Sequence, residues 1–316
     1  MVSRSPSTNG LYQQLAADVG ALGLSSGPGR PERVTEDHLD GLPGAAQWYL
    51  RFMGVLGRPA DWSFLAHLTG RFRMRPRLPW MRCEAWQYNS SPRVARLFHM
   101  RLGPARILPI VGRDAYVDGH GRMVGKLAGR VTVADGAGPE CDVAELVTYL
   151  NDAVLWAPSM LLVPAVRWGV VDEASFDVSL EDAGHRVTAR VFIDQRGAPV
   201  NFSTEDRWMD QRGGPVRTRW STPVDGWAEA NGRRQPTRGA AIWHLPEGPF
   251  TYAVFRFAPD AVRYNVAPGE LNTSAPPGTE AYLSPSRPWH GLGWPGRSRP
   301  RQAPGSATAR SSRSSP

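Results

Sequence analysis

The sequence lacks the short motifs by which many enzyme classes are recognised. It contains no G-x-S-x-G nucleophile elbow, no H-E-x-x-H zinc motif, no G-x-x-x-x-G-K phosphate loop and no C-x-x-C pair. The seven histidines are scattered singly. Asp118-x-His120 falls in a predicted hairpin turn, where Asp and Gly serve backbone geometry rather than metal binding. We therefore predict no catalytic residue, no metal site and no cofactor.

Lysine, cysteine and long apolar runs are also scarce. Only Lys126 is a lysine among the 37 Lys and Arg residues, which argues against lysine chemistry. The two cysteines, Cys83 and Cys141, fit buried thiols or, if strand and helix meet, a disulfide. No segment approaches the roughly 20 apolar residues that span a bilayer. The N-terminal stretch has Asp18 in its most apolar part, unlike a signal peptide. We expect a cytoplasmic protein without a transmembrane segment.

The positive charge is concentrated near the C-terminus. The net charge is +8, and six arginines with no acidic residue follow residue 284, so the rest of the chain carries about 8 − 6 = +2. We therefore expect no specific nucleic-acid binding by the folded part. A role of the arginine-rich tail in binding nucleic acid or an acidic partner remains a third hypothesis for function. The sequence does not indicate an oligomeric state.

Composition divides the chain into three parts. Residues 1–34 contain one short helical pattern and a Gly/Pro/Ser linker, and we expect a flexible N-terminal arm. Residues 35–266 are predicted to form a single β-rich domain. Residues 267–316, rich in Pro, Arg and Ser, are predicted to be a disordered tail, because they cannot bury enough apolar surface to offset the entropy of ordering.

Short strand-like segments joined by polar turns fill most of the middle part. Asp118-Gly119 and Asn231-Gly232 are typical hairpin turns. Parallel pairing needs connections of a dozen residues or more, so these short reversals indicate antiparallel strands. We predict a mainly β (α+β) fold: a large curved antiparallel sheet or incomplete barrel of about eleven strands, covered by one or two helices. The covering helices are predicted within 42–56 and 138–162.

The stretch 138–162 is the one long interruption of the strands. An apolar stripe at helical spacing predicts a helix that Pro158 ends or kinks, and we expect this stripe to form the wall or plug of a cavity. Glu140, Asp142 and Glu145 have two interpretations. They favour the positive end of the helix dipole, or they form a carboxylate cluster for acid/base work or cation binding.

Glu205-Asp206-Arg207 lies in a predicted strand, 200–209. Consecutive side chains of a strand point to opposite faces. Either this face is solvated, or Glu205 and Arg207 point inward and need partners such as Arg113 or Arg122. The second arrangement would be a buried polar network.

Several motifs between residues 42 and 264 resemble an uncharacterised family of bacterial proteins that share a domain of unknown function. They are G-R-D-A-Y-V-D-G with G-R-M (112–119 and 121–123), G-P-E (138–140), E-D-R (205–207) and P-E-G-P-F (246–250). The resemblance identifies a family rather than an activity. The order of elements is also similar in outline to the bacterial lipoprotein-carrier half-barrels, in which helices plug a curved sheet over an apolar cavity; this analogy transfers no function.

Aromatic residues are numerous for a domain of this size. Core packing accounts for many of them, and an apolar ligand cavity would use the same residues. The set comprises Trp48, Trp80, Trp86, Trp156, Trp168, Trp208, Trp220, Trp227, Trp243, Phe72 and Phe98.

The leading hypothesis is a non-enzymatic binding or carrier module that holds an apolar small molecule or lipid against the concave face of the sheet. The alternative is an enzyme with a carboxylate/arginine pocket of unknown reaction, in which Glu140, Glu205, Asp206 and Arg113 meet. The candidate ligand-binding residues are Trp86, Tyr116, Glu140, Leu150, Trp156, Glu205 and Arg207.

Overall fold

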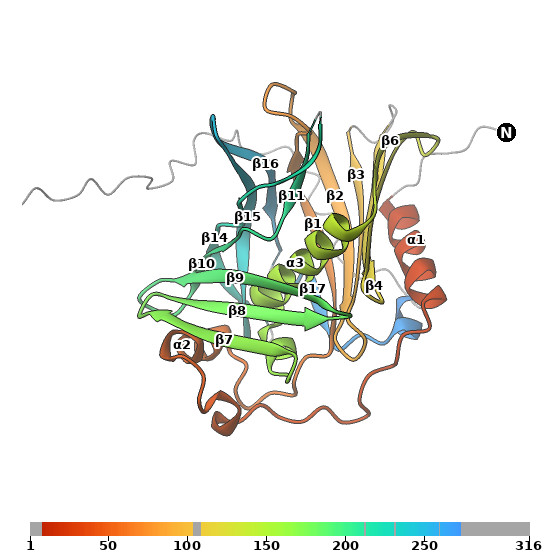
Figure 1. The fold of residues 1–316 in the computed structure, drawn as a ribbon. Helices are drawn as coiled ribbons and strands as arrows, with labels where there is room; N and C mark the ends of the chain where they lie inside the picture. The colour runs from red at the N-terminus through yellow and green to blue at the C-terminus, as the bar shows by residue number, and fades with distance from the viewer. Residues whose placement is uncertain (1–7, 104–108, 212, 231, 259, 273–316) are drawn as a thin grey trace, which may run out of the picture. The chain divides into compact units, whose positions relative to one another are not determined.

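Antiparallel strands dominate the chain (Figure 1). The computed structural model describes residues 8–103, 109–211, 213–230, 232–258 and 260–272. The first strands are β1 (Ser63–Phe72), β2 (Met81–Ser90), β3 (Ala95–Leu102), β4 (Ile110–Val117), β5 (His120–Leu127) and β6 (Val131–Gly136). The later strands are β7 (Val166–Asp172), β8 (Ser175–Asp182), β9 (His185–Ile193), β10 (Pro199–Thr204), β11 (Trp208–Gln211), β12 (Gly214–Arg217), β13 (Trp220–Ser221), β14 (Val224–Ala230), β15 (Arg233–Leu245), β16 (Gly248–Arg256) and β17 (Val262–Tyr264).

Fifteen strands form one sheet in the order β6-β5-β4-β3-β2-β1-β16-β15-β13-β10-β9-β8-β7, with β14 on β15 and β17 on β1. Two meanders meet where β1 pairs with β16, from Thr69 opposite Arg256 to Phe72 opposite Ala253. The sheet is not closed, because β6 and β7 stand at opposite ends of the order. The predicted fold class is therefore confirmed. The predicted number of strands, about eleven, is wrong.

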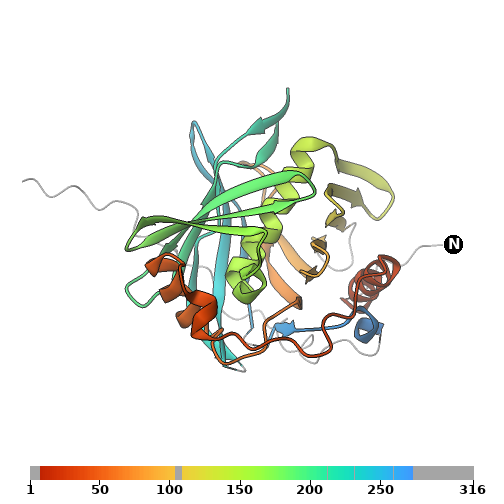
Figure 2. The same ribbon diagram turned by 60° about the horizontal axis from the view of Figure 1, so that its bottom comes forward.

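Helix α3 (Pro139–Trp156) connects these two edge strands across the concave side of the sheet (Figures 1 and 2). Pro139 occupies the first helical turn with Glu140 and Asp142, where a missing N–H and negative charge are both favourable. The helix ends before Pro158, which begins the short helix η2 (Pro158–Leu161). The predicted helix and its end are thus confirmed.

The first turn of α3 lies directly on β5. A β-carbon at Gly121 would be 2.2 Å from the carbonyl oxygen of Cys141, so only glycine allows this approach. The Gly121 N–H donates to Asp142 Oδ1 at 2.7 Å. The preceding turn has positive φ at Asp118 (53°) and Gly119 (83°), as a two-residue hairpin turn requires. Gly119 and Gly121, both in the motifs of the resembled family, therefore allow the first turn of α3 to pack directly on β5.

Helix α2 (Gly44–Met53) and the short helix η1 (Glu36–Leu39) precede the sheet, and α2 covers β7 and β8 on the side away from α3's start. Tyr49 of α2 is fully buried, and its hydroxyl donates to the Val154 carbonyl at 2.7 Å. Val154 belongs to the last turn of α3, whose carbonyls lack partners within the helix. This contact ties the two covering helices together.

Helix α1 (Thr8–Ala21) packs against β2, β3 and the short helix η3 (Pro268–Asn272). Leu11, Leu15 and Val19, four residues apart, are each fully buried. Tyr12 donates to the Leu271 carbonyl at 2.8 Å. The residues from Thr8 onwards therefore differ from the flexible arm expected over 1–34. The sequence did not show that the apolar side of α1 is buried, because the strands that cover it, β2 and β3, are distant in sequence.

A turn and a bend divide the chain at two places where a strand could have continued. Ala128 and Gly129, both with positive φ, form the turn between β5 and β6. The predicted strand 200–209 stops at Thr204, and residues 205–207 form a bend before β11. The alternation assumed for Glu205-Asp206-Arg207 is therefore wrong. None of the described helices is long and apolar enough to span a membrane. From residue 273 on, the predicted tail lies outside the described residues.

Candidate functional site

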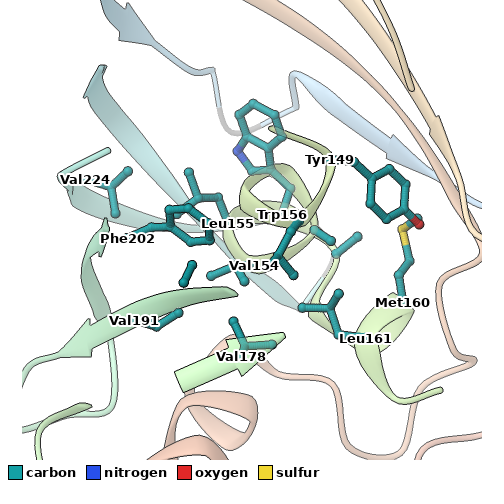
Figure 3. Close-up of a cluster of buried hydrophobic side chains, with 14 of the residues drawn as sticks. Tyr149, Val154, Leu155, Trp156, Met160, Leu161, Val178, Val191, Phe202 and Val224 are labelled. Atoms are coloured by element: carbon teal, nitrogen blue, oxygen red, sulfur yellow. The ribbon is translucent and has the colours of Figure 1, made fainter. Parts of the chain in front are cut away.

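The two sides of α3 face different surroundings. The predicted apolar stripe (Val143, Leu146, Val147, Leu150, Ala153, Val154) belongs to the main hydrophobic core. Figure 3 shows Val154 beside Val178 and Val191 of β8 and β9. The residues that line the cavity of the sheet recur at the same spacing on the other side: Glu140, Cys141, Ala144, Glu145, Thr148, Asn151, Asp152, Leu155 and Trp156. The prediction that the apolar stripe forms the cavity wall is therefore wrong. The more polar side of the helix forms that wall.

The cavity has a volume of about 600 Å³. It lies between α3 and the inward-facing residues of β1 to β5 and of β15 and β16. Along α3 it extends from Glu140 to Trp156, about 24 Å at a rise of roughly 1.5 Å per residue. Most of its wall is apolar: Leu68, Phe72, Phe98, Met100, Leu102, Met123, Val133, Leu155, Trp156, Trp208, Met209, Trp220, Val224, Trp243, Phe250, Tyr252, Phe255 and Phe257. Volume and lining are those of a small-molecule site.

A buried ion cluster is built around Arg96 of β3, which is 4% exposed. Its Nη1 donates to Glu145 Oε2 at 2.9 Å and its Nε to Asp152 Oδ2 at 2.8 Å. Gln87 of β2 also donates to Asp152, at 2.6 Å. Burial acts to lower the pKa of Arg96, but Asp152 and Glu145 hold it above its usual value. One strand arginine thus compensates Glu145 and Asp152, the two buried carboxylates of α3 in the cavity wall.

Asp114 of β4 adds a titratable group to the same wall. Burial, and then the charge of Glu145, raise the pKa of Asp114 to about 7, while Arg96 and Arg207 act to lower it. Its buried Oδ1 has no hydrogen-bond partner within the described part of the chain. Burial therefore favours the protonated form of Asp114, whose Oδ1 has unused hydrogen-bonding capacity.

Arg207 lies opposite this cluster and is held mainly by aromatic rings. Its guanidinium carbon is 4.5 Å from the ring centroid of Trp220 and 5.6 Å from that of Trp243. Nη1 donates to the Thr148 hydroxyl. Among the described residues, no carboxylate lies within ion-pair distance of Arg207, and its buried Nε has no acceptor. Stacking on indole faces suits a guanidinium that is only partly hydrated.

Three of the seven candidate ligand-binding residues line the cavity: Glu140, Trp156 and Arg207. Glu140 is exposed at the start of α3, whereas Trp156 is 4% exposed at its end. The indole Nε1 of Trp156 has no partner among the described residues. Of the two arrangements left open for residues 205–207, Arg207 adopts the inward one and Glu205 the exposed one, and a bend rather than a strand produces this.

The other four candidates lie elsewhere. Trp86 alternates with Gln87 along β2, so it faces outward, where Tyr12 and His67 pack against its ring. Tyr116 is buried and donates to Asp182 at 2.7 Å. Leu150 lies in the solid core on the far side of α3. Glu205 is exposed, 3.9 Å from Arg219.

The residues of the alternative enzyme hypothesis are not brought together. Arg113 pairs with Asp18 of α1, on the outer face, at 3.2 Å. Asp206 accepts hydrogen bonds from Arg217 and from the Thr188 N–H. Only Glu140 lines the cavity. The structure thus offers no carboxylate/arginine pocket made of these four groups.

Cys83 and Cys141 are free thiols. Burial, with Glu145, Asp114 and Asp142 beside it, raises the pKa of Cys141 to about 12, so this cavity thiol is not a nucleophile at neutral pH. In the described ranges, no three His, Cys, Asp or Glu side chains are grouped to hold a metal ion.

Sequence reasoning missed Arg96, Asp114 and Asp152. Asp152 carried a usable signal, because a carboxylate near the negative end of a helix is unfavourable unless a cation compensates it. Arg96, the second residue of β3 (Ala95–Leu102), was the matching signal, because it alternates in line with the apolar Phe98, Met100 and Leu102.

No curated protein is a significant match to this chain. Three solved structures are similar to it in outline. A LolA-superfamily protein from Nitrosomonas europaea has a TM-score of 0.35 at 13% identity, covering 67% of this chain and 91% of that one. A putative outer membrane lipoprotein-sorting protein domain from Vibrio parahaemolyticus has a TM-score of 0.33 at 7% identity, covering 67% and 89%. A DUF1329 family protein from Desulfovibrio piger has a TM-score of 0.35 at 9% identity, covering 70% and 91%.

These likenesses concern the outline of the fold alone. The family resemblance predicted from the sequence motifs is confirmed, because a family model matches residues 32–255. The chain belongs to the family of unknown function DUF6544.

Proposed function

We propose that this protein binds a lipid-like ligand in the cavity between α3 and the sheet, without acting as an enzyme on it. The observation that carries the proposal is the cavity itself: about 600 Å³, walled mainly by aromatic and aliphatic side chains in a protein whose interior is otherwise well packed. An apolar ligand would remove this surface from water, which contributes roughly 25 cal/mol per Å² of apolar area.

The polar part of the wall favours an amphipathic ligand over a pure hydrocarbon. The buried Asp114 Oδ1, Arg207 Nε and Trp156 Nε1 all lack partners among the described residues. Unpaired buried polar groups cost free energy that a ligand hydroxyl, carbonyl or carboxyl group would recover. The polar end of such a ligand would lie near Arg207 and Thr148, with its chain among the aromatic residues.

Mass spectrometry of lipids extracted from the purified protein tests the proposal directly. We expect a stoichiometric amphipathic lipid, and we expect the emptied protein to bind a fluorescent fatty-acid probe. Ala144→Trp would fill the cavity from α3, since Ala144 lines it beside Glu145 and Thr148. This variant should lose the probe and the lipid.

Ala174→Trp is the matched control, because Ala174 is exposed in the turn between β7 and β8. It should bind as the wild type does. If no lipid co-purifies and the probe binds equally to wild type and Ala144→Trp, the cavity is not the binding site and the proposal is wrong.

A further inference from the structure

The hairpin loop between β1 and β2 carries an unusual combination of side chains. Within residues 71–82 there are five arginines and no acidic residue. Three large apolar side chains of the same loop are exposed: Met74 (39%), Leu78 (45%) and Trp80 (36%). We call residues 73–82, which are the loop and the first two residues of β2, the arginine loop. Exposed apolar groups that gather in one place usually mark a contact surface.

Three arginines of this loop lack the carboxylate partners that several other exposed arginines of the protein have. Arg75, Arg77 and Arg82 are exposed and have no carboxylate within ion-pair distance among the described residues. By contrast, exposed Arg190 and Arg238 pair with Asp177 and Asp225. The positive charge of the arginine loop is therefore not neutralised within the described structure.

The loop also stands at the mouth of the cavity. Arg73, Met74 and Arg75 line it. Arg73 fixes the loop to the sheet, donating to the Thr251 carbonyl at 2.8 Å and lying 4.6 Å from the Trp80 ring centroid. Figure 1 shows the β1–β2 and β11–β12 hairpins projecting at the same end of the sheet. Val216 of β12 is a further exposed apolar residue, 45% exposed.

We propose that the arginine loop docks this protein on an anionic lipid bilayer, with Arg75, Arg77 and Arg82 at the phosphates and Met74, Leu78 and Trp80 in the interface. Charge complementarity and exposed apolar side chains are what a peripheral membrane contact requires. Tryptophan and arginine both suit the depth of the lipid head groups. Glu140 and Asp210, on other elements around the cavity mouth, carry negative charge that an anionic bilayer would repel. We therefore limit the proposed contact to the arginine loop.

Docking here would place the cavity mouth against the lipid phase. A lipid could then move between bilayer and cavity without crossing water. This consequence rests on the function proposed above, whereas the docking surface rests on the loop's own residues.

Flotation of the full-length protein with vesicles tests the docking. One set of vesicles is phosphatidylcholine alone, and the other contains equal parts of phosphatidylcholine and phosphatidylglycerol. We expect binding to the anionic vesicles only, weakening as salt is raised. Each arginine near an anionic surface contributes about a fivefold increase in binding. The variant Arg75→Gln/Arg77→Gln/Arg82→Gln should therefore bind on the order of 100-fold more weakly.

The control variant is Arg167→Gln/Arg186→Gln/Arg196→Gln, which changes the net charge equally at exposed positions on or beside β7, β9 and β10. It should bind as the wild type does. Leu78→Ser/Trp80→Ser should weaken vesicle binding while keeping its salt dependence. Thermal unfolding of each variant shows that the fold is retained.

Three results would overturn the docking proposal: no preference of the wild type for anionic vesicles, equal loss in the control variant, or binding to an RNA oligonucleotide with none to vesicles. Lipid extraction separates this inference from the proposed function. A protein that binds anionic vesicles but contains no lipid, and whose Ala144→Trp variant binds the probe as the wild type does, would contradict only the function. One that holds lipid but ignores vesicles would contradict only the docking.

Discussion

The two sides of α3 are both buried, yet they are stabilised in different ways. Toward β8 and β9, Leu146, Leu150 and Val154 are each fully buried in a solid hydrophobic core. Toward the cavity, Glu145 and Asp152 are 4% exposed and depend on one arginine. The difference shows that the polar side of an amphipathic helix need not face solvent. It can face a cavity if another element supplies the opposite charge.

Removing Arg96 should have the largest effect on stability. Arg96→Met leaves Glu145 and Asp152 buried without their cation, and breaking a buried ion pair in this way typically costs about 3–5 kcal/mol. Chemical denaturation measures the free energy of unfolding of variant and wild type.

The triple variant Arg96→Met/Glu145→Gln/Asp152→Asn removes all three charges and should recover much of the loss. Arg190→Met, which breaks the exposed pair with Asp177, should cost about 1 kcal/mol or less. A cost for Arg96→Met as small as that of Arg190→Met would show that the carboxylates are well hydrated and that the two sides of α3 do not differ in this respect.

On the packed side, Leu150→Ala should cost about 3 kcal/mol, within the roughly 2–5 kcal/mol found for buried leucines, because the solid core cannot collapse around the deleted methyl groups. The counterpart on the cavity side is Leu155→Ala, measured by the same denaturation experiment.

Leu155 is also buried but lines the existing cavity, so its truncation enlarges a space instead of creating one. We expect a clearly smaller cost than for Leu150→Ala. Equal costs for the two leucines would mean that both sides of α3 are packed alike.

The stability of the cavity side should depend on pH through Asp114. Its folded pKa of about 7 lies above the unfolded value of about 3.9. The stabilisation of the folded state by protonated Asp114 is therefore fully present below about pH 4 and is lost as pH rises toward about 7. Relative to wild type, Asp114→Asn should become progressively more stable across this window, as measured by denaturation at several pH values.

Asp118→Asn is a matched control on the exposed hairpin turn. The hydrogen bond from Arg93 lowers the pKa of Asp118, so this variant should lose relative stability as pH rises, with the change complete in more acidic solution. If the free energies of unfolding of Asp114→Asn and wild type differ by the same amount at every pH between 4 and 7, Asp114 is not protonated in the folded protein.

Much of the fold could be predicted from the sequence, because the signals are local. The turn Asp118-Gly119 and the stop at Pro158 depend on backbone geometry that a few residues determine. The one long connection between predicted strands identified residues 138–162 as the site of a helix, which α3 confirms. Which side of α3 faces the sheet was not predictable in this way, because both sides are buried and hydropathy separates only buried from exposed.

The site was harder to predict because its residues meet only through sheet pairing. Arg96 reaches α3 because β3 lies three strands from the β6 edge and alternation turns Arg96 inward. Trp86 was misplaced for the same reason: its outward orientation depends on the register of β2, which a one-residue shift would reverse. The orientation of Arg207 was left open by the sequence, because it depends on a bend that interrupts the predicted strand 200–209.

The smallest effect that separates the two sides concerns single hydrogen bonds to α3. Tyr49→Phe removes the donor to the Val154 carbonyl on the packed side, where water cannot replace it, and should cost about 1 kcal/mol. Thr222→Val removes the hydroxyl that donates to Asn151 on the cavity side. Both residues line a space of about 600 Å³, where water can take the place of the hydroxyl, so we expect a smaller cost.

Denaturation with ligand bound should raise the cost of Thr222→Val toward that of Tyr49→Phe, because a ligand that fills the cavity excludes the replacing water. If the two costs are equal without ligand and ligand changes neither, the cavity does not admit water and the polar side of α3 is as dry as the packed side.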